Sequence, residues 1–340
     1  MDLESIVIRE EAGRYESLAL GLQAVARAAD GELDYDALCA AMGVSLAAVS
    51  LRSEPAPGWW MTFGRDAFVE SAAKLFGIRL RNLHPPDVGV EMVAADEFPQ
   101  HFEASYKPLI LTALGNEQPV LAWQGWPDAS AMFWGVVTEA GDAGLRGTTL
   151  WAGGERVPLT GPALQCYVVE ECDPQDPPRD QLLAMALRHA DAYMNRAPLT
   201  PVVAGLTMPV LVTGPAAFDA WEEWLAGGEF GATDRDPAWR EHRQHAEFLV
   251  AARRSAVTFL NSIREIIPSE QQNLVDQLLD TCAAQVTLLG PSCDENGARA
   301  SFSSPAGRQT LLEAVHRAEA ADRRIAMMVE ELSRAANASA

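Results

Sequence analysis

The stretch PVLAWQGWPDASAMFWGVVTEAGDAGLRGTTLW, residues 119–151, decides the fold class of the N-terminal half. Its segments rich in β-branched and aromatic residues predict three short strands, over 119–123, 132–138 and 145–151. The glycine-containing turn at 139–144 indicates that the second and third strands form a hairpin. A fourth strand is expected at 165–170. Together these segments predict a small antiparallel sheet.

The segment CDPQDPP, residues 172–178, is the clearest linker in the chain, because prolines and turn formers cluster there. Helical patterns follow it, over 180–195, 216–225, 237–266, 270–289 and 305–334. The last pattern carries a wide apolar stripe that only Asp322 interrupts, and such stripes are typical of helices packed into a bundle. We therefore expect an α+β fold with a mixed domain over 1–172 and a mostly helical bundle domain over 179–340.

Charge and composition exclude several classes of partner. The 340 residues include 26 lysines and arginines against 47 acidic residues, a formal net charge of −21. Such a surface repels phosphate backbones and anionic lipids, so nucleic acid and membranes are not expected as partners. We find no secretion signal and no apolar run long enough to span a membrane. Five cysteines without a Cys-x-x-Cys pair favour a reducing compartment, and we expect the protein in the cytoplasm.

The run GRYESLAL, residues 13–20, opens a predicted helix, a second short helix follows at 34–43, and the PVLAW and FWGVVTE strands come much later. This layout resembles papain-fold proteins of the bacteriocin-leader peptidase type and the butirosin-type acyltransferases. The resemblance covers about residues 10–170 and implies a papain-like N-terminal domain. In those families a cysteine stands at the N-terminus of the first long helix and a histidine opens a strand. A helix N-terminus stabilises a thiolate, and an adjacent imidazole completes the activated pair.

This sequence departs from the family pattern at both catalytic positions. Tyr15 stands where the resemblance places the cysteine, and no cysteine precedes Cys39. Phe133 stands where it places the histidine, and no histidine lies between His101 and His189. We therefore do not transfer the catalytic activity. If the analogy holds, Tyr15 lies at the helix start and its ring contacts Phe133.

Other side chains that could carry chemistry have simpler structural interpretations. Ser17 is the only alternative nucleophile near the helix start, and an early-helix serine is more often a capping or packing hydroxyl. His242 and His245 share a helix face that could bind a metal, yet a solvated charged face is the preferred interpretation. Cys39 and Cys282 lie in apolar helical stretches and should be buried. We find no metal or cofactor motif, so neither is expected.

Tryptophan is the compositional exception, because six of the nine tryptophans fall in the first 151 residues. Aromatic side chains on loops beside a sheet often line ligand sites, although they also cover cores under long loops. The predicted ligand-binding residues are the two replaced catalytic positions and the nearby tryptophans: Tyr15, Trp59, Trp60, Trp123, Trp126, Phe133 and Trp134.

Three functions fit these observations. The first is a non-catalytic papain-like module that binds a small molecule or a peptide in an aromatic groove. The second is a hydrolase or acyltransferase that uses an unrecognised nucleophile such as Ser17. The third is a protein-interaction scaffold built on the helical half. The oligomeric state is left open.

Overall fold

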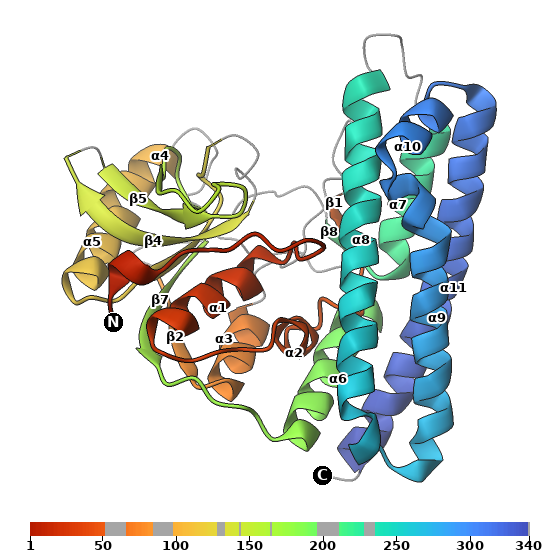
Figure 1. Cartoon of the computed structure of the whole chain (residues 1–340), viewed down its shortest axis with the longest axis horizontal. Coiled ribbons are helices and arrows are strands. Elements are labelled where there is room, and N and C mark those ends of the chain that lie inside the picture. Colours follow the sequence, from red (N-terminus) through yellow and green to blue (C-terminus); the bar gives the residue numbers. More distant parts are fainter. Residues whose placement is uncertain are drawn as a thin grey trace. The chain divides into compact units, whose positions relative to one another are not determined.

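A computed structural model describes residues 1–51, 66–83, 98–127, 133–142, 144–163, 165–195, 211–227 and 235–338. The fold is α+β, as predicted, with one six-stranded antiparallel sheet and a helical C-terminal region (Figure 1). The chain forms two compact units. The first comprises Met1–Leu38, Thr62–Pro177 and Pro201–Met208, and the second comprises Cys39–Met61, Pro178–Thr200 and Pro209–Ala340.

One change of unit, between Pro177 and Pro178, falls inside the predicted linker. The segment Cys39–Met61 belongs with the helical unit, although it precedes most of the sheet in the sequence. Its strand β1 (Val49–Leu51) pairs antiparallel with β8 (Leu211–Thr213). This grouping depends on pairing between residues far apart in the chain, which local sequence patterns do not report.

The sheet of the first unit has the strand order β2-β7-β3-β4-β5-β6, with every neighbouring pair antiparallel. The strands are β2 (Ile78–Asn82), β3 (Val120–Trp123), β4 (Trp134–Gly141), β5 (Gly144–Thr149), β6 (Val157–Pro158) and β7 (Gln165–Cys172). The predicted strands are therefore present. The hairpin turn is tighter than predicted, because β4 continues to Gly141 and pairs it with Gly144. Gly144 has a φ of +99°, which only glycine adopts without strain.

Helices cover both faces of this sheet (Figure 1). They are α1 (Ser17–Ala28), α3 (Asp66–Leu75), α4 (Phe98–His101), the π-helix η2 (Phe102–Tyr106) and α5 (Lys107–Gly115), with a short 3-10 turn η1 (Leu3–Ser5) at the start. Helix α2 (Tyr35–Ala41) is divided between the two units after Leu38. Helix α1 approaches one face so closely that a Cβ on Gly21 would lie 3.1 Å from Leu121 Cδ2. On the other face, Ile110 of α5 shares a buried cluster with Val137. Alternation along the strands separates these two sets of side chains.

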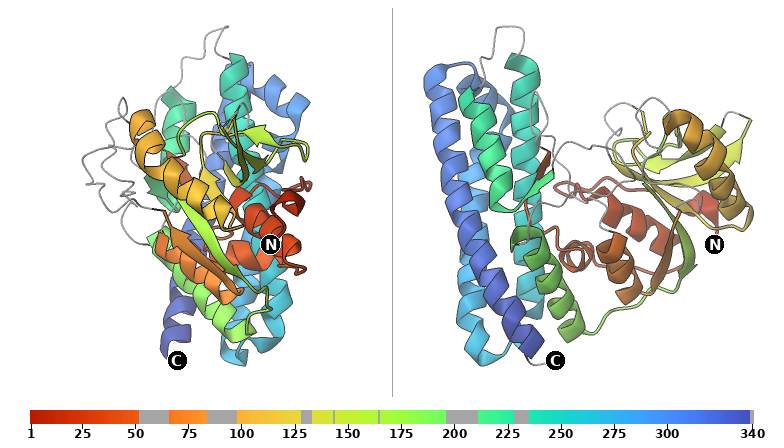
Figure 2. Two further views of the ribbon diagram at one scale, coloured as in Figure 1. Left: turned by 90° about the vertical axis from the view of Figure 1, so that its left-hand side faces the viewer. Right: turned by 180° about the vertical axis from the view of Figure 1, so that it is seen from behind.

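The second unit is mostly helical and contains α6 (Arg179–Asn195), α7 (Pro215–Gly227), α8 (Arg235–Ile263), η4 (Arg264–Ile266), α9 (Ser269–Cys293), α10 (Glu295–Phe302) and α11 (Pro305–Ala338) (Figure 2). Helix α10 is an addition to the predicted set. The predicted stripe of α11 is buried from Leu311 to Leu332. No described helix is long and apolar enough to cross a membrane.

Asp322, the polar residue that interrupts the apolar stripe of α11, has a hydrogen-bonding partner. Asp322 is fully buried, and its Oδ1 accepts a hydrogen bond from Arg253 Nη2 at 2.5 Å. Arg253 Nε donates to Gln285 Oε1 at 2.5 Å, and Arg253 Nη1 donates to the Ser45 carbonyl at 3.0 Å. One buried guanidinium therefore joins α8, α9, α11 and the Cys39–Met61 segment.

The prediction of a solvated face for His242 and His245 is wrong, since both residues are buried. Trp221 of α7 covers them, with its ring centroid 5.3 Å from that of His242 and 4.6 Å from that of His245. Trp221 Nε1 donates a hydrogen bond to His242 Nδ1 at 3.2 Å. The sequence pattern around the histidines is polar, but the facing helix supplies an apolar partner that only the tertiary structure provides.

Candidate functional site

The site that the sequence indicates begins where α1 starts. Glu16 is the N-cap residue, and its Oε1 accepts a hydrogen bond from the Leu18 N–H at 3.0 Å. The Tyr35 hydroxyl accepts the Glu16 N–H at 2.9 Å, which fixes the entry of the chain into the helix. Tyr15 directly precedes this cap and is half-buried. The predicted position of Tyr15 beside the N-terminus of the first long helix is therefore confirmed.

Ser17 connects this helix start to the sheet. Its Oγ accepts a hydrogen bond from the Trp134 N–H, the first residue of β4, at 2.9 Å. The side chain is buried, with the residue 4% exposed. Within the described part of the chain no histidine is hydrogen-bonded to Ser17. The hydroxyl therefore has a structural partner, and among the described residues it lacks the hydrogen-bonded base that a serine nucleophile needs.

Three of the predicted ligand-binding tryptophans are packed inside the unit. Trp134 lies between Trp123 and Tyr167, with ring centroids 6.5 and 5.8 Å away. Trp126 lies on the α5 side of the sheet, where its Nε1 donates to the Ala122 carbonyl at 3.1 Å. A Cβ on Gly135 would lie 2.5 Å from the Trp126 ring, so this glycine makes room for it. Trp59 and Trp60 lie outside the described residues.

Phe133 and Trp151 form an aromatic pair beside the helix start that the sequence did not indicate. Their ring centroids are 4.6 Å apart at an interplanar angle of 73°, an edge-to-face arrangement. Trp151 is 37% exposed, whereas Phe133 is 9% exposed. Phe133 immediately precedes Trp134, whose N–H binds Ser17. Trp151 therefore presents an accessible aromatic surface, backed by the buried Phe133 ring, at the edge where α1 and β4 meet.

The backbone around Phe133 is strained on two sides. Trp151 has a φ of +67°, and Gln124, whose N–H donates to the Phe133 carbonyl at 3.1 Å, has a φ of +68°. Two other described non-glycine residues, Asp30 and Glu117, have positive φ, and both directly follow helix C-caps, where this conformation is common. A left-handed tryptophan is an outlier, and such outliers concentrate at functional sites.

The sequence places Trp151 at the end of a predicted strand, and this position alone does not show whether the side chain is exposed or buried. Trp151 stands before Ala152-Gly153-Gly154 at the predicted end of a strand, where its side chain could equally have continued the buried face. The contact with Phe133 and the left-handed backbone are properties of the folded chain. Glu10 also reaches this edge, since its Oε1 accepts the Gly153 N–H at 3.2 Å.

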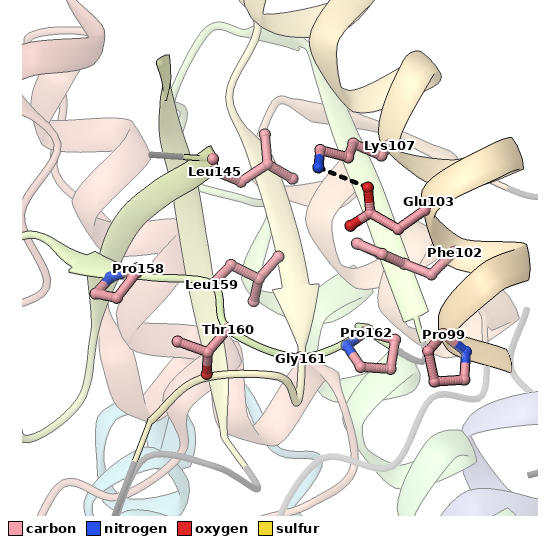
Figure 3. A pocket seen from close by; sticks show the side chains of 11 residues that line it. Pro99, Phe102, Glu103, Lys107, Leu145, Pro158, Leu159, Thr160, Gly161 and Pro162 are labelled. Atoms are coloured by element: carbon pink, nitrogen blue, oxygen red, sulfur yellow. Dashed lines mark hydrogen bonds and ion pairs between the residues drawn. The ribbon is translucent and has the colours of Figure 1, made fainter. Parts of the chain in front are cut away.

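A separate recess lies on the α5 side of the sheet (Figure 3). It has a volume of about 360 Å³, within the size range of small-molecule pockets. Phe102 and Leu145 form apolar walls, and the loop Leu159–Pro162 closes one side. Its two charged groups neutralise each other, because Lys107 Nζ lies 2.6 Å from Glu103 Oε2. The recess therefore offers apolar contact beside one ion pair.

The five cysteines provide no activated nucleophile. All lie in described parts of the chain and none is in a disulfide. Cys39 and Cys282 are buried, as predicted. Burial raises the pKa of Cys282 to about 12, and it raises those of the half-buried Cys172 and Cys293 to about 11. Each raised pKa leaves little thiolate at neutral pH.

We expect slow alkylation of the native protein by iodoacetamide, with Cys172 and Cys293 modified before the other three. The reason is that these two have solvent access, while all the raised pKa values suppress the thiolate. Peptide mapping of a time course at pH 7.5 checks the order, and labelling in urea gives the reference rate. Rapid stoichiometric labelling of Cys39 or Cys282 in the native state would contradict this prediction.

Neither a protein-family model nor a curated protein sequence matches this chain.

Proposed function

We propose that the first unit is a non-catalytic papain-like module that binds a small aromatic molecule or an aromatic side chain of a peptide at the α1–β4 edge. The observation that carries this proposal is the Phe133–Trp151 pair. An exposed tryptophan held in a left-handed conformation against a second ring is costly for the fold, and it offers a flat surface for stacking.

The residues at the helix start support the non-catalytic assignment, because they are not the catalytic pair of the resembled family. Tyr15 and Phe133 stand where the family resemblance requires the cysteine and the histidine. Ser17 is buried and bound to the backbone of β4. The hydrolase or acyltransferase alternative would need a nucleophile with a nearby base, and no described histidine is hydrogen-bonded to Ser17. The contact between the Tyr15 and Phe133 rings stays a prediction.

The interaction-scaffold alternative concerns the helical unit and makes a different prediction. A scaffold would retain a protein partner through purification, whereas the proposed module would retain a small ligand or none. Native mass spectrometry of the full chain distinguishes these outcomes by the mass that is bound.

Replacing Trp151 with glycine is expected to weaken ligand binding about tenfold or more, because the stacking surface is lost. Glycine adopts a positive φ without strain, so the fold should be retained. The probes are N-acetylated phenylalanine, tyrosine and tryptophan amides and short peptides that contain them. Ligand-observed NMR with the full chain measures binding.

Leu111→Ala is the matched control, because Leu111 is an exposed apolar side chain on α5 with 44% exposure. Binding should be unchanged in this variant. Binding that survives Trp151→Gly but is lost in Phe102→Ala would place the ligand in the recess of Figure 3 and contradict the proposed site. Stoichiometric labelling of Ser17 by a fluorophosphonate probe would favour the hydrolase alternative.

A further inference from the structure

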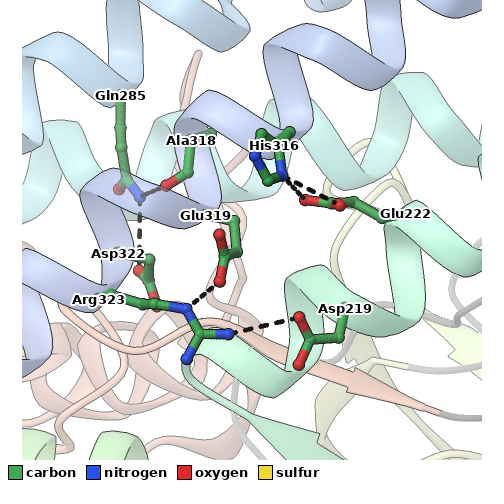
Figure 4. Close-up of polar contacts among 8 residues, drawn as sticks. All are labelled: Asp219, Glu222, Gln285, His316, Ala318, Glu319, Asp322 and Arg323. Atoms are coloured by element: carbon green, nitrogen blue, oxygen red, sulfur yellow. Dashed lines mark hydrogen bonds and ion pairs between the residues drawn. The ribbon is translucent and has the colours of Figure 1, made fainter.

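Two polar helix faces meet between α7 and α11 in the helical unit (Figure 4). His316 and Glu319 lie three residues apart on α11, and Glu222 faces them from α7. Side chains at this spacing share one face of a helix. The two helices are held in place by a common buried cluster that includes Phe218 of α7 and Val315 of α11. The three polar side chains therefore project from a rigid base.

The distance between His316 and Glu222 suits a shared cation, and Glu319 lies near enough to complete the site by turning toward it. His316 Nδ1 lies 3.3 Å from each carboxylate oxygen of Glu222. One potential ligand atom from each of the three residues can be chosen so that all lie within 4.8 Å of one another. A charge-assisted hydrogen bond between imidazole and carboxylate is shorter, at about 2.7–2.9 Å. Two ligands of a tetrahedral zinc ion, each bonded at about 2.0–2.1 Å, lie about 3.3–3.4 Å apart.

The charge balance also favours a divalent cation. Arg323 contacts Glu319 and lies 3.6 Å from Asp219 of α7. Two carboxylates therefore contact one guanidinium, and Glu222 adds a third negative charge to the cluster, which leaves two negative charges when His316 is neutral. Glu319 is buried and Glu222 is three-quarters buried at its side chain.

We propose that Glu222, His316 and Glu319 bind one divalent transition-metal ion, with Zn²⁺ the ion whose ligand preferences fit best. One imidazole and two carboxylates are a zinc donor set, and hard cations such as Mg²⁺ and Ca²⁺ prefer oxygen ligands alone. His316 is 69% exposed at its side chain, so water completes the coordination from the solvent side. Arg323 keeps Asp219 as its partner when Glu319 turns to the metal. The ion links α7 to α11.

Titration of the full, untagged chain with Co²⁺ tests this site, because a tetrahedral Co²⁺ ion with nitrogen and oxygen ligands absorbs visible light. We expect one Co²⁺ per chain, displaced by equimolar Zn²⁺ and not by excess Mg²⁺ or Ca²⁺. Acidification should release the ion, since ligation needs a neutral imidazole. No saturable 1:1 binding, or equal competition by Mg²⁺, would overturn the proposal.

Two variants locate the ion. His316→Ala and Glu222→Gln should each weaken Zn²⁺ binding about tenfold or more. Glu330→Gln is the matched control, because Glu330 is a partly exposed glutamate of α11 that pairs with Arg334, fourteen residues from His316. Its affinity should equal that of the unaltered chain, and circular dichroism should show equal helix content in all four proteins. Unchanged Zn²⁺ affinity in both site variants would show that the metal binds elsewhere and would overturn the assignment.

Discussion

Arg253→Ala is expected to destabilise the helical unit by about 3–5 kcal/mol. The guanidinium of Arg253 is fully buried and forms hydrogen bonds to Asp322, Gln285 and the Ser45 carbonyl. Alanine removes all three and leaves the Asp322 carboxylate buried without its counter-charge. Burial already raises the pKa of Asp322, an effect that Arg253 opposes, so the variant raises it further. The destabilisation should therefore be smaller in acid, where a protonated Asp322 costs less.

Urea denaturation followed by circular dichroism at pH 7 measures this change in the free energy of unfolding. Arg254→Ala is the matched control, because Arg254 is the next residue of α8 and is exposed. It should change stability by no more than about 0.5 kcal/mol. The double replacement Arg253→Met with Asp322→Leu should recover only part of the loss, because it removes the unpaired carboxylate but leaves Gln285 Oε1 and the Ser45 carbonyl without their donor. A loss below about 1 kcal/mol in Arg253→Ala would contradict the prediction.

The elements that the sequence predicted are those with their own local signal. Strands β3, β4, β5 and β7 each contain β-branched residues, all but β5 also contain an aromatic residue, and the long helices each carry an apolar stripe. The pairing of β1 with β8 has no such signal, because each strand has only three residues and the two strands are about 160 residues apart in the sequence.

The burial and the partners of polar residues also depend on tertiary contacts that the sequence alone does not show. Asp322 interrupted an apolar stripe, which indicates a buried partner, but the identity of Arg253 depends on how α8 packs against α11. His242 and His245 occur among charged residues and were predicted to be solvated, yet Trp221 buries them. At the candidate site, Tyr15 could be placed from the helix start, whereas the Phe133–Trp151 contact required the fold.

Two buried histidines should make the protein lose stability between pH 7 and pH 5. Burial lowers the pKa of His242 and of His189 from the ordinary 6.5 to about 4. His242 Nδ1 accepts the Trp221 indole N–H, and His189 Nδ1 donates to the Ala41 carbonyl at 2.5 Å. The first contact requires an unprotonated Nδ1, whereas the second raises the pKa of His189 and is outweighed by burial. The folded chain therefore takes up these protons only near pH 4, while the unfolded chain takes them up near pH 6.5.

The sign follows from proton uptake. Above pH 6.5 neither state binds the protons, and stability is at its full value. As the pH falls below 6.5, protons bind to the unfolded state and favour it, so the stability contribution is lost progressively until the folded-state pKa is reached. Each histidine should cost about 2 kcal/mol by pH 5. The effect ends near pH 4, where the folded state also becomes protonated.

Urea denaturation at several pH values between 7 and 5, with a metal chelator present, measures the slope of stability against pH. His242→Phe removes one titrating ring while it keeps an aromatic group beside Trp221, so the slope should fall by about one proton. Met327→Ala is the control, because that side chain is exposed on α11 and carries no titrating group, so its loss should leave the slope unchanged. A slope that His242→Phe does not reduce would show that other groups control the acid response, and that the neutral His242 ring does not limit the stability of the bundle.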